Sequence, residues 1–289
     1  MQVRINRKLA GVLAMFVIVG GGYAWMHGSA REEHAAVKLT PPAAPALGTT
    51  LPAPVQAPGP MPIPASIVES DQSLRVQVDR LLANHDPESA YAAYFLVSAC
   101  TTFNANRELK LYDNKLHAQR DMTADEQRHM TRLCGEMTER ERQSRLDYLA
   151  IAVKAGVPGA AWAFASEGPF GDPSALKTRP DDPLVKEWKA QAVTQLTEAA
   201  EAGDLATLMI WGMQNLSGSD LTDKHPELGY GYLLAFGFIA GEGGKDEISA
   251  QLYKDGSAMM DAFAYGLTVE QRTAAITAAQ RIARNVNKK

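Results

Sequence analysis

The two cysteines are the first residues whose type and spacing suggest chemistry. Cys100 and Cys134 are the only cysteines of the 289-residue chain, and each lies in a segment predicted to be a helix. In an oxidising compartment an even pair favours one disulfide. Closing this span would stabilise the fold by about 3–4 kcal/mol on the chain-entropy model. We expect a structural disulfide, with two separate buried thiols or a redox role as the alternatives.

Compact catalytic and metal-binding motifs are missing from the sequence. None of the six histidines has a second histidine or a cysteine four residues away on a predicted helix, and no HExxH or GxSxG motif occurs. The glycines at 241–244 are not followed by Lys-Ser or Lys-Thr, so they do not predict a nucleotide-binding loop. We therefore predict no catalytic residue, no metal site and no cofactor.

Residues 167–182, EGPFGDPSALKTRPDD, combine prolines, charges and an aromatic residue in what we expect to be a long loop. Ordered long loops between helices are often binding elements. The candidate partner-binding residues are Glu167, Phe170, Asp172, Lys177, Arg179 and Asp182. Two alternatives remain: a connector with Phe170 buried in the core, or an enzyme that uses Glu167 and Asp172 as paired carboxyl groups on a glycan.

The elements that would position these residues are helices. From about residue 70 onward, apolar residues recur at spacings of three and four, and no window shows sustained alternation, so residues 67–289 predict an all-α domain with essentially no sheet. Helix starts are indicated at Asp86-Pro87, Thr123, Thr138, Asp182-Pro183 and Thr268. In the helix that starts after Thr138, we expect a buried face made of Leu146, Leu149, Ala150 and Val153.

Two helical stretches resemble each other at an offset of 47 residues. Residues 146–171 match residues 193–218, with Leu149 aligned to Leu196 and Gly156 aligned to Gly203. A weaker third copy starts near Pro226 and ends its first helix at Ala240-Gly241. Such self-similarity indicates stacked helical hairpins with a glycine in the turn.

At these residues the chain resembles the Sel1-like branch of the tetratricopeptide-type repeats. The resemblance covers about residues 140–260 and rests on LTEAAEAGD at 196–204, on Leu208, Gly212 and Gly218, and on PELGYGYLLAFGFIAG at 226–241. The sequence departs from the repeat pattern between Gly168 and Pro183 and again after Gly241. The resemblance implies a solenoid-like helical domain that scaffolds proteins, often in the bacterial envelope, and it does not imply an enzyme. An ordinary irregular helical bundle is the alternative fold.

The N-terminal part of the chain predicts a membrane anchor. Residues 1–8 carry three basic side chains, and Leu9–Met26 is an uncharged stretch of 18 residues. That length spans about 27 Å as a helix, close to the thickness of a bilayer core. The basic end predicts a cytoplasmic N-terminus and a periplasmic C-terminal domain in the bacterial inner membrane. The alternative is a signal peptide cleaved near Ala30. Residues 27–66, which include nine prolines, predict an extended linker.

The overall charge excludes one class of partner and leaves several functions open. A formal charge of −4 offers no basic surface for nucleic acid. We expect a non-enzymatic interaction protein whose partners are unknown envelope proteins. An envelope enzyme acting on glycan, and an inhibitor or immunity-type protein that binds a single target, are the alternatives.

Overall fold

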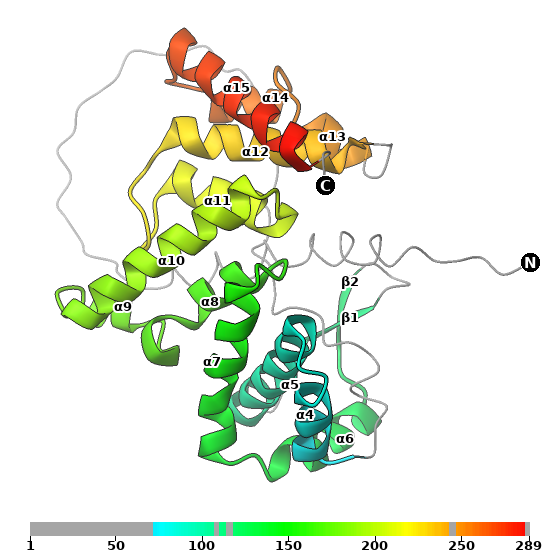
Figure 1. Cartoon of the computed structure of the whole chain (residues 1–289). Coiled ribbons are helices and arrows are strands. Elements are labelled where there is room, and N and C mark those ends of the chain that lie inside the picture. The colour runs from blue at the N-terminus through cyan, green and yellow to red at the C-terminus, as the bar shows by residue number, and fades with distance from the viewer. Residues whose placement is uncertain (1–71, 107–109, 114–117, 243–246, 287–289) are drawn as a thin grey trace, which may run out of the picture. The chain divides into compact units, whose positions relative to one another are not determined.

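The structure is a computed structural model that describes residues 72–106, 110–113, 118–242 and 247–286 (Figure 1). The predicted anchor at Leu9–Met26 and the linker at 27–66 lie outside the described residues. Among the helices that are described, none combines the length and the apolar composition needed to cross a membrane.

The described residues are mainly helical, as predicted, with one short pair of strands. Strands β1 (Lys110–Asp113) and β2 (Ala118–Asp121) form a two-stranded sheet. Essentially no sheet was predicted from the sequence, so this strand pair was not anticipated. Four-residue strands are too short to show a clear alternation of apolar and polar residues. The strand pair belongs mostly to a different unit from the helices, and the helices are described by themselves below.

The first helices build a core around the disulfide. They are α4 (Leu74–Leu82), α5 (Pro87–Asn106), α6 (Ala124–Gly135) and α7 (Glu139–Lys154). Capping boxes start α6 at Thr123 and α7 at Thr138, as predicted. The Sγ atoms of Cys100 and Cys134 are bonded at 2.06 Å, and both residues are fully buried. The predicted disulfide is therefore present, and it joins α5 to α6.

The middle of the helical unit carries the loop that the sequence singled out. Its elements are α8 (Ala160–Glu167), the short 3-10 helix η2 (Pro169–Gly171), α9 (Ala175–Thr178), α10 (Pro183–Glu201) and α11 (Leu205–Ser217). Helix α10 begins at the predicted Asp182-Pro183, where the Asp182 carboxylate accepts the Leu184 N–H at 2.9 Å.

The C-terminal helices pack on α12, which is buried along most of its length. They are α12 (Pro226–Ala240), α13 (Glu247–Leu252), α14 (Ala258–Phe263) and α15 (Val269–Val286). Asp255 links them, because its carboxylate accepts hydrogen bonds from the Tyr230 hydroxyl of α12 at 2.5 Å and from the Arg272 guanidinium of α15 at 2.6 Å. The same guanidinium lies 5.8 Å from the centre of the Tyr230 ring.

Seven of the described helices contact one another in the order in which they occur along the chain, with shorter elements between some of them. Helix α5 packs on α7, α7 on α8, α8 on α10, α10 on α11, α11 on α12 and α12 on α15 (Figure 1). This order of contacts is typical of stacked helical hairpins.

The turns after α7 and α10 have the same backbone geometry. Gly156 has a φ of 70° and Gly203 a φ of 84°. The Val157 N–H donates to the Ala152 carbonyl, and 47 residues later the Asp204 N–H donates to the Ala199 carbonyl, both at 3.0 Å. These bonds are Schellman closures, in which glycine occupies the left-handed position. The two predicted copies therefore end their first helices identically.

The proposed third copy ends its first helix differently. Gly241, which follows α12, has a φ of −77° and stays in the right-handed helical region. A Cβ on Gly241 would lie only 2.4 Å from the Cβ of Ala250, which explains the glycine by close packing on α13 rather than by turn geometry. The alignment of Gly241 with Gly203 as an equivalent turn is therefore wrong.

The buried face of α7 also differs from the predicted one. Leu149 is buried as expected, but Ala150 is exposed, and Arg145 and Ala152 take buried positions instead. A pattern of hydrophobic residues does not predict a buried arginine, because the burial of Arg145 depends on a partner from another helix.

Candidate functional site

The 167–182 segment connects α8 to α10, and its first residue is part of the core. The Glu167 carboxylate pairs with the Arg145 guanidinium, with Nη2–Oε2 at 2.6 Å and Nε–Oε1 at 3.2 Å. The two side chains are only 13% and 5% exposed. The Ser98 hydroxyl of α5 donates to the same carboxylate at 3.4 Å. Glu167 therefore ties α8 to α7 and α5, and it does not lie on the loop surface.

Arg145 was not a candidate in the sequence analysis, although it anchors the loop. Its guanidinium also donates to the Arg142 carbonyl at 2.6 Å. A Cβ on Gly171 would lie 3.1 Å from the Arg145 Nη2, so the backbone of η2 rests on the guanidinium. Burial raises the pKa of the neighbouring Tyr94 hydroxyl, and the negative charge of Glu167 raises it further. No spacing rule relates Arg145 to Glu167, because the pair forms only when α7 and α8 pack together.

Phe170 is exposed and has an unusual backbone conformation. Its φ of 59° and ψ of 23° lie in the left-handed region, and 57% of the residue is exposed. For a bulky residue this conformation costs about 1–3 kcal/mol and persists only where the surrounding structure enforces it. The alternative in which Phe170 is buried in the core and pins the loop is wrong.

The remaining loop candidates form polar contacts at the surface. The Asp172 carboxylate accepts the Ser174 hydroxyl at 2.6 Å, and this hydrogen bond lowers the pKa of Asp172. Lys177 reaches Asp220 in the loop after α11 at 3.5 Å, and Arg179 lies 3.9 Å from Asp182. Surface ion pairs of this kind contribute about 0–1 kcal/mol each and shape the loop more than they stabilise it.

The two carboxyl groups that were considered for glycan chemistry lie in different environments. The Glu167 carboxylate is engaged by Arg145 in the core, whereas the Asp172 carboxylate is exposed and bound by Ser174. A glycosidase needs both groups to reach one bond of the substrate. Within the described residues, no group of three His, Cys, Asp or Glu side chains could hold a metal ion.

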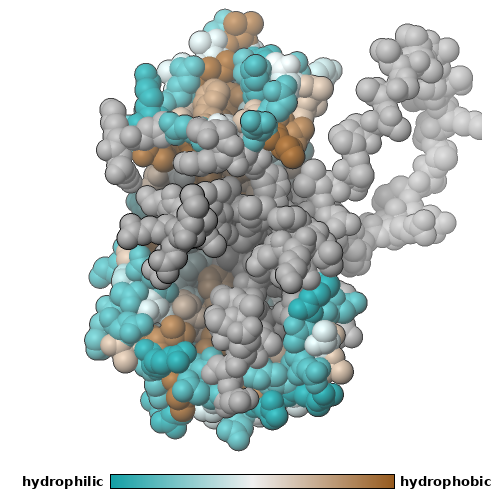
Figure 2. Space-filling view, turned by 90° about the vertical axis from the view of Figure 1, so that its right-hand side faces the viewer, coloured by the Kyte–Doolittle hydropathy of each residue, from teal (hydrophilic) through white to brown (hydrophobic). Residues whose placement is uncertain are grey.

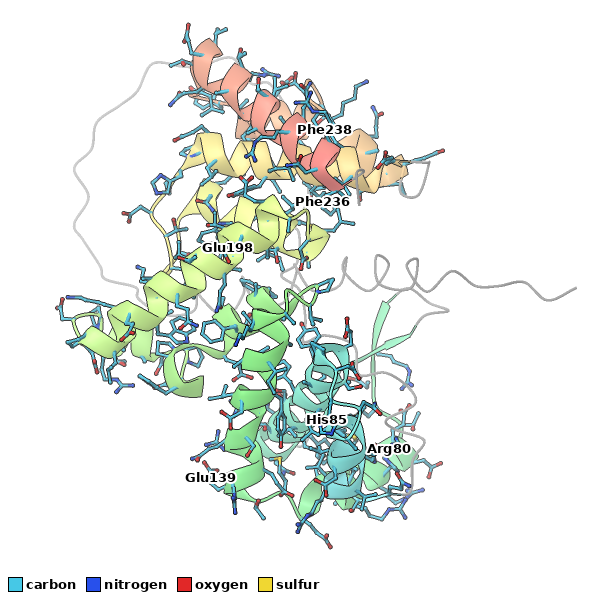
Figure 3. The ribbon with its side chains drawn as sticks, in the orientation of Figure 1. Arg80, His85, Glu139, Glu198, Phe236 and Phe238 are labelled. Carbon is cyan, nitrogen blue, oxygen red and sulfur yellow. A yellow bond between two sulfur atoms is a disulfide. The ribbon has the colours of Figure 1, made fainter. Side chains whose placement is uncertain are left out.

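A groove that the sequence analysis did not identify lies between the two matching hairpins. It has a volume of about 420 Å³, and its walls come from the end of α7, the start of α8 and the end of α10. Its polar side chains are Gln195, Glu198 and Asp204; Figure 3 shows Glu198 on α10, away from Glu139 at the start of α7. The groove forms where the two equivalent turns approach each other, at residues 156–158 and 202–204.

Asp204 fastens the two hairpins beside this groove. Its carboxylate accepts the backbone N–H of Gly159 from the first hairpin and the N–H of Thr207 from the second. Burial raises the pKa of Asp204, and these backbone hydrogen bonds oppose that shift. Since both oxygens of its carboxylate have donors, Asp204 acts mainly as a structural clasp, that is, a hydrogen-bonded link between the two hairpins.

The surface offers few broad apolar areas on the face that Figure 2 shows. There, the brown hydrophobic areas of the described residues lie among more numerous teal hydrophilic ones. Phe170 and Tyr265, which is 92% exposed, are the aromatic residues among the large hydrophobic side chains exposed in the described part of the chain.

Comparison of the chain with protein-family models, with characterised proteins and with solved structures gave no match.

Proposed function

We propose that this chain is a non-enzymatic, membrane-anchored protein of the bacterial envelope, whose periplasmic helical-repeat domain binds partner proteins through the 167–182 loop. The observation that carries the proposal is Phe170, an aromatic side chain that is 57% exposed on a strained backbone. Strained conformations cluster at functional sites, and aromatic residues dominate the energetics of protein interfaces.

The fixed base of the loop supports this role for Phe170. The Arg145–Glu167 pair lies buried directly beneath η2, and Gly171 packs on the guanidinium. An aromatic residue held in one position loses little conformational entropy when a partner covers it, so a larger part of the contact energy appears as affinity. A flexible loop would not provide this advantage.

The disulfide supports the proposed compartment. Disulfides persist in the periplasm and are rare in the cytosol. Cys100 and Cys134 are bonded in the core of the domain that follows the predicted anchor. A domain stabilised by a disulfide is consistent with a cytoplasmic N-terminus and a periplasmic C-terminal domain, the orientation that the three basic side chains of residues 1–8 favour.

The proposal is tested by capture of partners from crosslinked membranes with the full chain. We compare wild type with Phe170→Ala and with Tyr265→Ala, a control that removes a still more exposed aromatic ring from another loop. The proposal predicts that one or a few envelope proteins accompany wild type and Tyr265→Ala and are lost with Phe170→Ala. Equal capture by all three proteins would remove the loop from the function.

An inhibitor or immunity-type protein is the second candidate, and the same experiment addresses it. A single partner held at one-to-one stoichiometry through detergent washes would favour that reading over a scaffold with several partners. The envelope enzyme receives no support from the loop, because Glu167 is held in a buried ion pair.

A further inference from the structure

The groove between the two matching hairpins has a consistent chemical character. Its lining is built mainly from small or apolar residues, which are Val153, Gly156, Val157, Pro158, Ala161, Ala199, Ala202 and Gly203. Its volume of about 420 Å³ lies within the usual range for small-ligand sites, about 300–1,000 Å³. The groove is therefore large enough for a long side chain and part of the backbone that carries it.

The polar side chains of the groove present acceptors. The Oε1 atom of Gln195 is buried and has no hydrogen-bond partner within the described part of the chain. Glu198 has a free carboxylate, since none of the ion pairs or side-chain hydrogen bonds found among the described residues involves it. Asp204 adds a second carboxylate, whose oxygens already accept the N–H groups of Gly159 and Thr207. The lining contains no lysine, arginine or histidine that would neutralise these groups.

This combination selects a ligand that brings its own donors and positive charge. The exposed carboxylate of Glu198 has no partner in the regions that the structure describes, and a ligand that supplies a positive charge gives it one. Lysine and arginine side chains carry donors at the tip and an apolar stem that packs well against alanine, valine and proline. An anionic ligand would be repelled by the Glu198 carboxylate, and the lining has no cationic side chain to offset this repulsion.

We propose that the groove binds a lysine or arginine side chain from an extended basic segment of a partner protein. The charged tip reaches the carboxylate of Glu198, and the stem lies on the apolar wall from Val153 to Ala161. This site uses none of the residues of the Phe170 loop, so it stands or falls separately from the proposed function.

The test is an NMR titration of the full chain, deuterated and kept in mild detergent, with blocked pentapeptides. The probe is acetyl-Ala-Lys-Ala-Lys-Ala-amide, and the comparison is the same peptide with glutamate in place of lysine. The reporters are the backbone amide signals of Gly156 and Gly203 and the side-chain amide of Gln195. We expect saturable shifts of all three with the lysine peptide and none with the glutamate peptide.

Variants of one helix make the test specific. Glu198→Gln should weaken binding of the lysine peptide about three- to fivefold, the range expected for a partly exposed charge pair, and Glu198→Lys about tenfold or more. Glu187→Lys is the matched control, because Glu187 is exposed on the same helix and outside the groove. It should leave the affinity within about twofold.

Three results would overturn the proposal. They are the absence of saturable shifts up to about 10 mM peptide, an equal response to the glutamate peptide, and an affinity that Glu198→Lys leaves unchanged. Phe170→Ala should retain the shifts, so loss of the loop function would not be mistaken for loss of the groove.

Discussion

Replacing Glu167 by glutamine should destabilise the domain far more than its position in a loop-like sequence suggests. The substitution keeps the size of the side chain and removes its charge. Arg145 then remains buried, with 5% of its side chain exposed and only the Arg142 carbonyl and a neutral amide as acceptors. Removing one partner of a buried pair costs about 3–5 kcal/mol, and the 13% exposure of Glu167 places this case near the lower end.

The loss is measurable by urea and by thermal unfolding with the disulfide intact. A decrease of about 3 kcal/mol corresponds to a melting temperature lower by about 6–12 °C in a domain of this size. The matched control is Glu187→Gln, an exposed carboxylate of α10, which should change the free energy of unfolding by less than about 0.5 kcal/mol.

A double-mutant cycle separates the ion pair from other effects. The variant with both Arg145→Met and Glu167→Leu leaves no buried charge, so it should lose less stability than Glu167→Gln alone. A loss of stability below about 1 kcal/mol for Glu167→Gln would refute the reasoning from burial. So would a double variant that loses more stability than Arg145→Met and Glu167→Leu lose together as single variants.

Three further predictions concern the disulfide, the clasp and the turns. Replacing both Cys100 and Cys134 by serine should lower the free energy of unfolding by about 2–5 kcal/mol in urea melts, with strong reductant giving a similar loss in wild type and none in the variant. Burial raises the pKa of Asp204 above its ordinary value of 3.8, so the native state binds the proton more tightly than the unfolded chain does. The free energy of unfolding of wild type relative to Asp204→Asn should therefore rise as the pH falls from neutrality toward 3.8. A difference that does not change with pH would contradict this prediction. Gly156→Ala should lower the free energy of unfolding by about 1 kcal/mol from backbone strain alone, since its Cβ would meet open space. Gly203→Ala should lower it more, because its Cβ would lie 2.0 Å from Cγ2 of Val286 in α15. Equal melting temperatures of the two variants would show that this contact relaxes freely.

Local signals predicted the elements of the fold well, because they act over a few residues. Thr123 and Thr138 each form a capping box with a glutamate three residues later, and Asp182-Pro183 starts α10. The disulfide also followed from the sequence, since only one pairing is available to two cysteines. In these cases the residues that matter are adjacent or unique.

Features that depend on packing between helices escaped prediction. From its sequence context Arg145 is expected to be exposed, and its burial follows only from the packing of α8, which carries Glu167. Gly241 has the same sequence context as Gly203, but its glycine is required by close packing on α13. The groove arises where two turns 47 residues apart meet, which no local pattern encodes. Phe170 is the instructive case, because an aromatic residue is normally assigned to the core, and the structure exposes it.

The most direct test of the central claim is site-specific photocrosslinking at Phe170 in living cells. A photoreactive phenylalanine analogue is placed at position 170 or, as the control, at Tyr265, which is 92% exposed on a different loop. We predict a discrete crosslinked envelope protein from position 170 that position 265 does not yield. No adduct from position 170, or the same adducts from both positions, would contradict it.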